Sequence, residues 1–226
     1  MRASLADQGG AGVPSSLAIA LGANLPSAAG GPEDTLRAVR PLLSAALPAW
    51  LIGLEPTAAS SPQVWSPGRN AAGPGRTPLR LHWSPLFRTA PLGGPPGQPD
   101  YLNAVLLLQP LPPPALTSAL AVLNRLQELE QRFQRQRGPR WGPRSLDLDL
   151  LWWGELRADS PQLQLPHPRW RERAFVLAPL LAIEAALAMP IALPGPPQAL
   201  PALLRQVRRS GQEVPLPLPP REGWPE

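Results

Sequence analysis

The chain has 226 residues, of which 43% are hydrophobic, and its 21 basic and 16 acidic residues give a formal net charge of +5. It contains no cysteine and only two histidines, which excludes disulfides, thiolate zinc sites and histidine-rich metal clusters. All 21 basic residues are arginines, so the lysine that a P-loop or a Schiff-base enzyme needs is missing. Any phosphate binding must therefore rely on arginine, whose planar fork matches phosphate geometry.

The N-terminal part of the chain predicts one strand and one helix between irregular segments. Residues 1–15 are expected to form a disordered tail, and the apolar run SLAIALG at residues 16–22 predicts a buried strand. Residues 32–47 begin with proline and two acids, as helices often do, while Pro41 predicts a kink or an early end. Residues 53–78 are rich in Pro, Gly, Ser and Ala and predict a loop insertion without a functional site.

Strands and helices follow in the rest of the chain. The apolar patterns predict strands at residues 79–89 (interrupted at Pro85), 101–109 and 145–153, and helices at residues 115–137, 172–187 and 199–209. The core order of strand, helix, strand, strand, helix, strand is that of a split βαββαβ unit. We therefore expect an α+β, ferredoxin-like domain over residues 16–190, with an antiparallel sheet and helices on one face. A C-terminal extension follows at residues 191–226.

The sequence also sets expectations about location and partners. No apolar run approaches the ~20 residues of a membrane span. Asp7 and the glycine-rich spacer after it argue against a secretory signal. We expect a cytoplasmic monomer that binds neither membranes nor nucleic acid.

Two aspartates stand inside the apolar run RWGPRSLDLDLLWWG at residues 140–154. Because side chains alternate along a strand, Asp147 and Asp149 share one face, with their Cα atoms about 6.6 Å apart. Leu146, Leu148 and Leu150 share the other face and pack inward. Paired carboxylates suit Mg²⁺, which binds through one or two carboxylates together with substrate phosphates. The alternative is the solvent-exposed face of an edge strand.

Nine of the 21 arginines fall in two short windows around the aspartates, at residues 125–144 and 169–173. Such clustering beside a metal site fits a clamp for a polyphosphate. The alternatives are a solvated basic face, a non-enzymatic RNA-binding module on the same fold, or another Mg²⁺-dependent nucleotidyl transferase. RNA-binding modules of this fold stack bases on strand aromatics, and the strands here lack the paired aromatics around glycine that mark them.

A third group of residues suits a flat heterocycle. Tyr101, the only tyrosine, opens a predicted strand, and Asn103 lies two residues later on the same face. Asparagine offers a donor and an acceptor to the edge of such a ring, and an aromatic side chain offers a face contact. Phe175 is a candidate for a second aromatic wall. Simple core packing is the alternative for Tyr101 and for Phe175.

Four segments carry a resemblance to a known family: LGANL, FRTAPLGGPPGQPDYLNAV, ELEQRFQRQRGPRWGPRSLDLDLL and LPHPRWRERAFVLAPL. Over residues 16–47 and 80–190, the chain resembles the 6-hydroxymethyl-7,8-dihydropterin pyrophosphokinases of tetrahydrofolate biosynthesis. The resemblance implies Mg²⁺-dependent transfer of the β,γ-pyrophosphoryl group of ATP to the pterin hydroxymethyl group. The products are then the pterin diphosphate and AMP.

The resemblance also implies roles for individual residues. Asp147 and Asp149 would hold two Mg²⁺ ions, with Arg135 and Arg144 as further catalytic residues. A loop with Trp141 and Arg144 would close over both substrates. The implied pterin-binding residues are Gly22, Asn24, Thr89, Leu92, Tyr101, Asn103, Trp141 and Phe175. The implied ATP-binding residues are Gln127, Glu130, Arg135, His167 and Arg173.

Two positions near these segments depart from the family pattern. Gln134 stands where the family usually has glycine, and Ala23 replaces a usual serine. Neither is one of the predicted metal or pterin residues. We therefore expect the departures to affect the course of the loop beside ATP rather than the chemistry.

Overall fold

The computed structural model describes residues 15–52, 78–112, 114–136, 138–139 and 141–224. Nearly all of the predicted tail at residues 1–15 and of the predicted insertion at residues 53–78 lies outside these ranges. None of the helices in the described ranges is long and apolar enough to cross a membrane.

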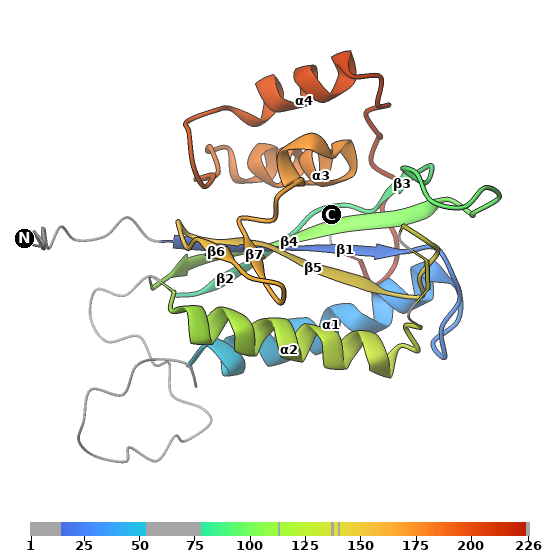
Figure 1. Cartoon of the computed structure of the whole chain (residues 1–226), viewed down its shortest axis with the longest axis horizontal. Helices are drawn as coiled ribbons and strands as arrows, with labels where there is room; N and C mark the ends of the chain where they lie inside the picture. The colour runs from blue at the N-terminus through green and yellow to red at the C-terminus, as the bar shows by residue number, and fades with distance from the viewer. Residues whose placement is uncertain (1–14, 53–77, 113, 137, 140, 225–226) are drawn as a thin grey trace, which may run out of the picture.

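The described residues form a central sheet with helices on both sides and a small separate hairpin (Figure 1). The elements in chain order are β1 (Ser15–Ala23), α1 (Pro32–Ile52), β2 (Arg80–Trp83), β3 (Phe87–Thr89), β4 (Tyr101–Leu111), α2 (Leu116–Arg132), β5 (Asp147–Trp153), β6 (Ala158–Asp159), β7 (Gln164–Leu165), the 3₁₀ helix η1 (Trp170–Glu172), α3 (Ala174–Leu187) and α4 (Leu200–Arg209).

The strand β1 lies at the centre of the sheet, between β4 and β5. The order is β2-β4-β1-β5, every pair is antiparallel, and β3 also pairs with β4. The break between β2 and β3 contains Pro85, as predicted, because proline has no N–H to donate to a ladder. The predicted α+β class with an antiparallel sheet is confirmed, and the strands connect as in a split βαββαβ unit.

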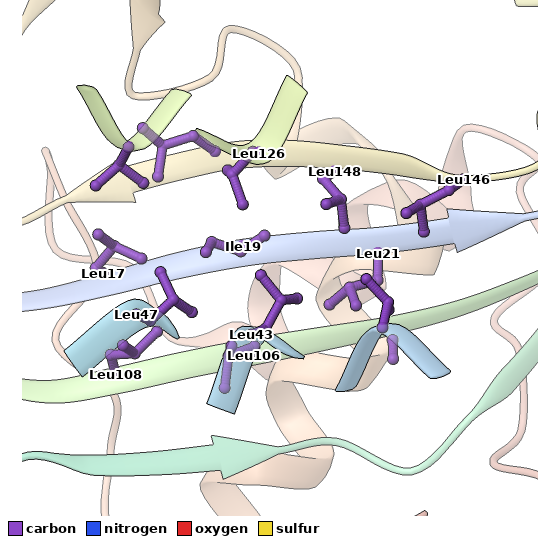
Figure 2. Packing of buried hydrophobic residues seen from close by; sticks show 14 of the residues in the cluster. Leu17, Ile19, Leu21, Leu43, Leu47, Leu106, Leu108, Leu126, Leu146 and Leu148 are labelled. Carbon is purple, nitrogen blue, oxygen red and sulfur yellow. The ribbon is translucent and has the colours of Figure 1, made fainter. Parts of the chain in front are cut away.

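One face of the sheet is buried under α1 and α2. Leu17, Ile19 and Leu21 of β1 point to this face, where Figure 2 shows them beside leucines of the neighbouring strands and of both helices. Leu146 and Leu148 lie in the same cluster, as the alternation in the sequence predicted. The strand period of two thus fixes which residues of β1 and β5 turn toward the opposite face.

The opposite face is also covered, so the prediction of helices on one face only was incomplete. Helix α3 packs on this face and α4 packs on the outer side of α3 (Figure 1), and both helices share one buried cluster with Ala18, Val105, Leu107 and Trp152. The physical reason lies in the strands: β4 and the second half of β5 (residues 150–153) are apolar on both faces, whereas the first half of β5 alternates between aspartate and leucine. Strands of that kind need a layer of helices on each side.

Two helix ends differ from the prediction. Of the two alternatives predicted for Pro41, a kink or an early end, the early end was wrong, since α1 continues through Pro41 and Pro48 to Ile52. Leu43, Leu47 and other apolar residues beyond Pro41 are buried against the sheet, and this burial offsets the lost hydrogen bonds. Helix α2 ends at Arg132, before the predicted position 137, because the chain turns at Gln134 with a φ of 61°.

The C-terminal extension returns along the sheet after α4. Leu218 donates its backbone N–H to the Leu86 carbonyl oxygen at 2.7 Å, and an isolated bridge joins Pro217 to Phe87. Trp224 is only 5% exposed, and its Nε1 donates to the Ser84 carbonyl oxygen at 2.8 Å. The extension therefore runs from the face with α3 and α4 past β3 to the cluster under α1 and α2, to which Trp224 belongs.

Removing the Trp224 side chain should destabilise the fold. A large aromatic truncated in a core costs about 3 kcal/mol, so Trp224→Ala should lower the free energy of unfolding by that amount, measured by urea denaturation. Leu216→Ala in the same extension is the control, because Leu216 is 80% exposed and its loss should change stability by less than about 0.5 kcal/mol. Equal stability of the two variants would show that the extension is not anchored through Trp224.

Candidate active site

The two aspartates of β5 face the side of the sheet that carries α3. Asp149 lies opposite Ala20 of β1, and Asp147 lies opposite Gly22. Both side chains line one cavity of about 300 Å³, while Leu148 between them is buried in the core. The predicted shared face is thus present, and the face opens into a space that a ligand can occupy.

Gly22 makes room in the floor of this cavity. It pairs with Asp147 on one side and with Asn103 on the other, so these three residues form one row across the sheet. A Cβ atom at Gly22 would lie 3.2 Å from Asn103 Oδ1 and 3.9 Å from Asp147 Cβ. A side chain there would fill the space between the carboxylate and the amide, which the glycine leaves open for a ligand.

Most of the predicted site residues meet at this cavity. The predicted residues in its lining are Gly22, Thr89, Leu92, Tyr101, Asn103, Trp141, Arg144, Asp147, Asp149, His167, Arg173 and Phe175. The lining also includes Ala20, Leu21, Ala90 and Arg169, which were not assigned to the site. Two signals pointed to such residues: Ala20 precedes Gly22 by two positions on the same strand face, and Arg169 belongs to the second arginine window.

Arginines hold both carboxylates. Asp147 Oδ1 lies 2.6 Å from Arg144 Nη1 and 2.9 Å from Arg135 Nη1, and Asp149 Oδ2 lies 3.4 Å from Arg173 Nη1. Burial and the neighbouring Asp149 raise the pKa of Asp147, and the two arginines oppose this rise. Among the described residues, these contacts use one oxygen of each carboxylate, so each keeps a second oxygen for a further ligand.

His167 stands beside Asp149 as a neutral imidazole. Burial, with a contribution from Arg173, lowers the pKa of His167 to about 4. Its Nδ1 accepts the backbone N–H of Arg169 at 3.2 Å, which places the ring proton on Nε2. Nε2 lies 4.0 Å from Asp149 Oδ2. The histidine therefore offers one N–H donor next to the carboxylate and adds no positive charge at neutral pH.

Glu130 and Arg135 lie behind the aspartates rather than in the cavity lining. Glu130 is 5% exposed, accepts the backbone N–H of Leu148 at 2.7 Å and pairs with Arg135. Burial raises the pKa of Glu130 to about 7, against the opposing effect of Arg135. Glu130 thus ties α2 to β5 and orients the guanidinium that reaches Asp147. Gln127, also predicted for the ATP site, is exposed on α2 and does not line this cavity. It is also absent from the lining of a second, adjoining cavity that is described below.

Asn24 fixes the segment that carries Arg144. Its Oδ1 accepts the backbone N–H of Arg144 at 2.7 Å, and its Nδ2 donates to the Pro99 carbonyl oxygen at 3.0 Å. The backbone N–H groups of Asn24 and Leu25 both donate to the Arg144 carbonyl oxygen. Asn24 is only 2% exposed and is absent from the lining of the cavity. It therefore joins two loops at the site, and its predicted direct contact with substrate stays a prediction.

Tyr101, Asn103 and Gln98 donate hydrogen bonds to partners around the cavity. The Tyr101 hydroxyl donates to the Gly142 carbonyl oxygen at 2.9 Å, and Asn103 Nδ2 donates to Thr89 Oγ1 at 2.7 Å. Gln98 Nε2 donates to the carbonyl oxygen of Trp141 at 3.1 Å. Residues 91–99 and the segment at Trp141 therefore meet at the rim of the cavity, and the Asn103 amide is oriented before any ligand binds.

A second cavity of about 370 Å³ adjoins the first. Both cavities include Asp149 and His167 in their lining, and the second is otherwise formed by β5, the hairpin β6–β7 and Leu123 of α2. The hairpin was not among the predicted elements. Asp149 and His167 therefore stand at the border of two spaces, one toward Tyr101 and Phe175 and the other toward the hairpin.

The donor set suits a hard cation that also binds substrate. In the described ranges, no group of three or more His, Cys, Asp or Glu side chains could enclose a metal ion. Two carboxylates alone cannot complete a coordination shell. They match the demand of Mg²⁺, which takes one or two carboxylates and fills its other positions with water and substrate phosphates.

Comparison with known proteins identifies the family. The model of the 7,8-dihydro-6-hydroxymethylpterin-pyrophosphokinase (HPPK) family matches residues 71–185, which is half of the chain. The chain belongs to the HPPK family. The matched residues include Asp147, Asp149, Tyr101 and Phe175, so the segment that matches the family model contains most of the candidate active site.

Relatives support the assignment to the HPPK family. Proteins named 2-amino-4-hydroxy-6-hydroxymethyldihydropteridine pyrophosphokinase are similar to this chain in Pseudomonas aeruginosa (43% identity over 107 residues) and Synechocystis (45% over 91 residues). These matches cover 47% and 40% of this chain, and 62% and 43% of the two relatives. The relative from Mycobacterium bovis is 35% identical over 139 residues, which cover 58% of this chain and 70% of the relative. The chain thus spans less than two thirds of the length of the first two relatives.

Replacing Asn24 should damage the fold at the site. Asn24→Ala leaves the backbone N–H of Arg144 and the Pro99 carbonyl oxygen without their partner, so we expect a loss of roughly 1–3 kcal/mol in the free energy of unfolding. Urea denaturation measures this loss. Gln127→Ala is the control, because Gln127, predicted for the ATP site, is exposed, and its loss should change stability by less than about 0.5 kcal/mol. An Asn24→Ala protein as stable as the control would contradict the structural role of Asn24.

Proposed function

We propose that this protein transfers the pyrophosphoryl group of ATP to 6-hydroxymethyl-7,8-dihydropterin in a Mg²⁺-dependent reaction of folate biosynthesis. The observation that carries the proposal is the placement of Asp147 and Asp149 on one strand face, with Asp149 at the border of two adjoining cavities. A reaction between a nucleotide and a second substrate needs two such spaces with the charged groups between them. The HPPK family match and the names of the relatives support the same reaction.

The pterin fits the cavity between Tyr101 and Phe175. Both aromatic residues line it, and Asn103 lies in the floor with its amide oriented by Thr89. Aromatic faces attract a flat heterocycle, and an oriented amide reads the donor and acceptor pattern on the edge of the ring. The open floor at Gly22 lets the ring lie close to Asn103 and Asp147.

ATP fits the adjoining cavity, with its phosphates directed toward the border. His167 offers an N–H there, and Arg173 offers a guanidinium next to Asp149. Arg135 and Arg144 approach the other aspartate. The proposed roles of His167 and Arg173 in ATP binding agree with these positions, since both lie beside Asp149 at the border. Arg135 contacts Asp147, which lines the first cavity on the same strand face.

The two aspartates would hold Mg²⁺, and we propose two ions. When bound, Mg²⁺ neutralises the phosphate charge that would otherwise repel the attacking oxygen. The residues of the chain contribute by positioning the two substrates. Tyr101 and Phe175 fix the pterin ring, and the arginines and His167 orient the triphosphate. The pterin oxygen would form a bond to the β-phosphorus while the bond from that phosphorus to the oxygen bridging the α- and β-phosphates breaks. AMP then leaves with that oxygen, and the pterin hydroxyl proton is released to solvent.

Trp141 and Arg144 lie on the segment proposed to exclude water. Trp141 is at the rim, with its backbone held by Gln98, and the guanidinium carbon of Arg169 lies 5.6 Å from its ring centroid. A closed segment would protect the transferred group from hydrolysis. A monomeric state, a cytoplasmic location and the absence of a nucleic-acid partner stay predictions from the sequence.

The test of the proposal is AMP formation. The purified protein should release AMP from ATP and Mg²⁺ only when 6-hydroxymethyl-7,8-dihydropterin is present, and chelation of Mg²⁺ should stop the reaction. AMP release without pterin would indicate a different nucleotidyl transferase. Retention of RNA with a steep salt dependence and no AMP would favour a nucleic-acid-binding module instead.

The aspartate pair should be indispensable for turnover. Asp149→Asn removes one charge from the metal site while keeping the size of the side chain, so we expect kcat to fall at least about 100-fold. Asp159→Asn on the hairpin is the matched control, because Asp159 is exposed and lines neither cavity, and its kcat should stay unchanged. Turnover by Asp149→Asn at the control rate would disprove a metal role for Asp149.

A further inference from the structure

The C-terminal extension places one glutamine against the backbone on both sides of Arg173. Gln212 Nε2 donates to the Glu172 carbonyl oxygen at 2.7 Å, and Gln212 Oε1 accepts the backbone N–H of Ala174 at 3.2 Å. Arg173 between them is extended, with φ −119° and ψ 110°. In extended backbone, the carbonyl before a residue and the N–H after it point to the same side. A single carboxamide, with a donor and an acceptor, therefore binds both groups as a neighbouring strand would.

The position of Gln212 is fixed by the end of α4. The apolar face of α4, including Leu203, Leu204 and Val207, is buried in the cluster that contains α3. Gly211 then turns the chain with a φ of +89°, a conformation that glycine adopts without strain. The next residue, Gln212, faces the start of α3. Ser210, Gly211 and Gln212 follow α4, and the two hydrogen bonds of Gln212 join the C-terminal extension to the backbone at Arg173.

Arg173 is the residue that this link holds in place. Its guanidinium contacts Asp149 Oδ2 at 3.4 Å and lies 5.4 Å from the ring centroid of Phe175. Arg173 is also the N-cap residue of α3, and its side chain makes no capping hydrogen bond to the helix. A small rotation of the backbone at this residue would move the guanidinium away from Asp149, because the side chain extends from that point into the cavity.

We propose that Gln212 is a positioning residue for the reaction, which acts by fixing the backbone of Arg173. The inference rests on the proposed function. Gln212 lies outside the lining of the cavity that contains Asp147 and Asp149, so it does not touch the reacting groups. Its loss leaves both cavities in place but displaces the guanidinium proposed to orient the triphosphate, so the effect falls on kcat and on the KM for ATP, while the KM for the pterin stays unchanged.

Two variants separate this role from simple helix capping. Gln212→Ala removes both hydrogen bonds. Gln212→Glu keeps an acceptor for the Ala174 N–H but places its second oxygen against the Glu172 carbonyl oxygen. Both roles allow a lower melting temperature for Gln212→Glu, so kcat is compared at a temperature at which both proteins are folded. A capping role alone would leave that kcat equal to the unmodified protein's. A positioning role predicts a kcat roughly tenfold lower, as losses of partners one step from a reacting group commonly are.

Gln198→Ala is the matched control. Gln198 is a half-buried glutamine of the same extension, and it accepts from Arg171 Nη1 at 3.4 Å. Neither Gln198 nor Arg171 lines the two cavities that meet at Asp149. The control should keep the kcat of the unmodified protein.

A double variant completes the experiment. If Gln212 acts through Arg173, Gln212→Ala should lower kcat no further in a protein that already carries Arg173→Ala. Equal losses in both backgrounds, or a Gln212→Ala protein as active as Gln198→Ala, would overturn the inference while the proposed function stands. An unmodified protein that forms no AMP with pterin would reject the proposed function and this inference together.

Discussion

The structure depends on the alternation of side chains along β5. Burial of Leu146, Leu148 and Leu150 under α1 and α2 fixes the register of the strand, and the intervening Asp147 and Asp149 must then face the cavity. A slip by one residue would exchange the two sets and place carboxylates in the core, which costs far more than marginal stability allows. The same leucines that stabilise the fold therefore set the geometry of the charged site.

Two carboxylates on neighbouring positions of one face repel each other, and the chain offsets this repulsion with arginine. Arg135 and Arg144 hold Asp147, and Arg173 holds Asp149, before any ligand is present. Each guanidinium has several N–H donors, so it can keep contact with a carboxylate while it binds a phosphate oxygen. In a chain without lysine, this geometry lets one set of cations serve both the resting site and the triphosphate proposed to bind there.

The sequence was sufficient where one local pattern determined the outcome. The strand period predicted the shared face of Asp147 and Asp149, and the order of elements predicted the antiparallel sheet. Contacts between distant segments could not be predicted in this way. Asn24 meets Pro99 and Arg144 only after the chain has folded, and nothing in the residues around Trp224 indicates that it packs against Trp83. The sequence also did not predict that a layer of α3 and α4 covers the second face of the sheet. Strand β4 is apolar along nearly its whole length, and such a strand does not show how many of its faces are covered.

Gln134 illustrates how a departure from the family pattern can be absorbed. The resemblance noted in the sequence implies a glycine there, and Gln134 takes the left-handed conformation that glycine favours, with a φ of 61°. For a residue with a Cβ atom this costs about 1–2 kcal/mol. The turn nevertheless closes, since Gln134 donates its N–H to the Gln131 carbonyl oxygen at 2.9 Å and Arg135 donates to that of Glu130 at 3.0 Å. The pair of Arg135 with Glu130 and Asp147 then holds the turn in place, so the charged network at the site stabilises the strained backbone that leads into it.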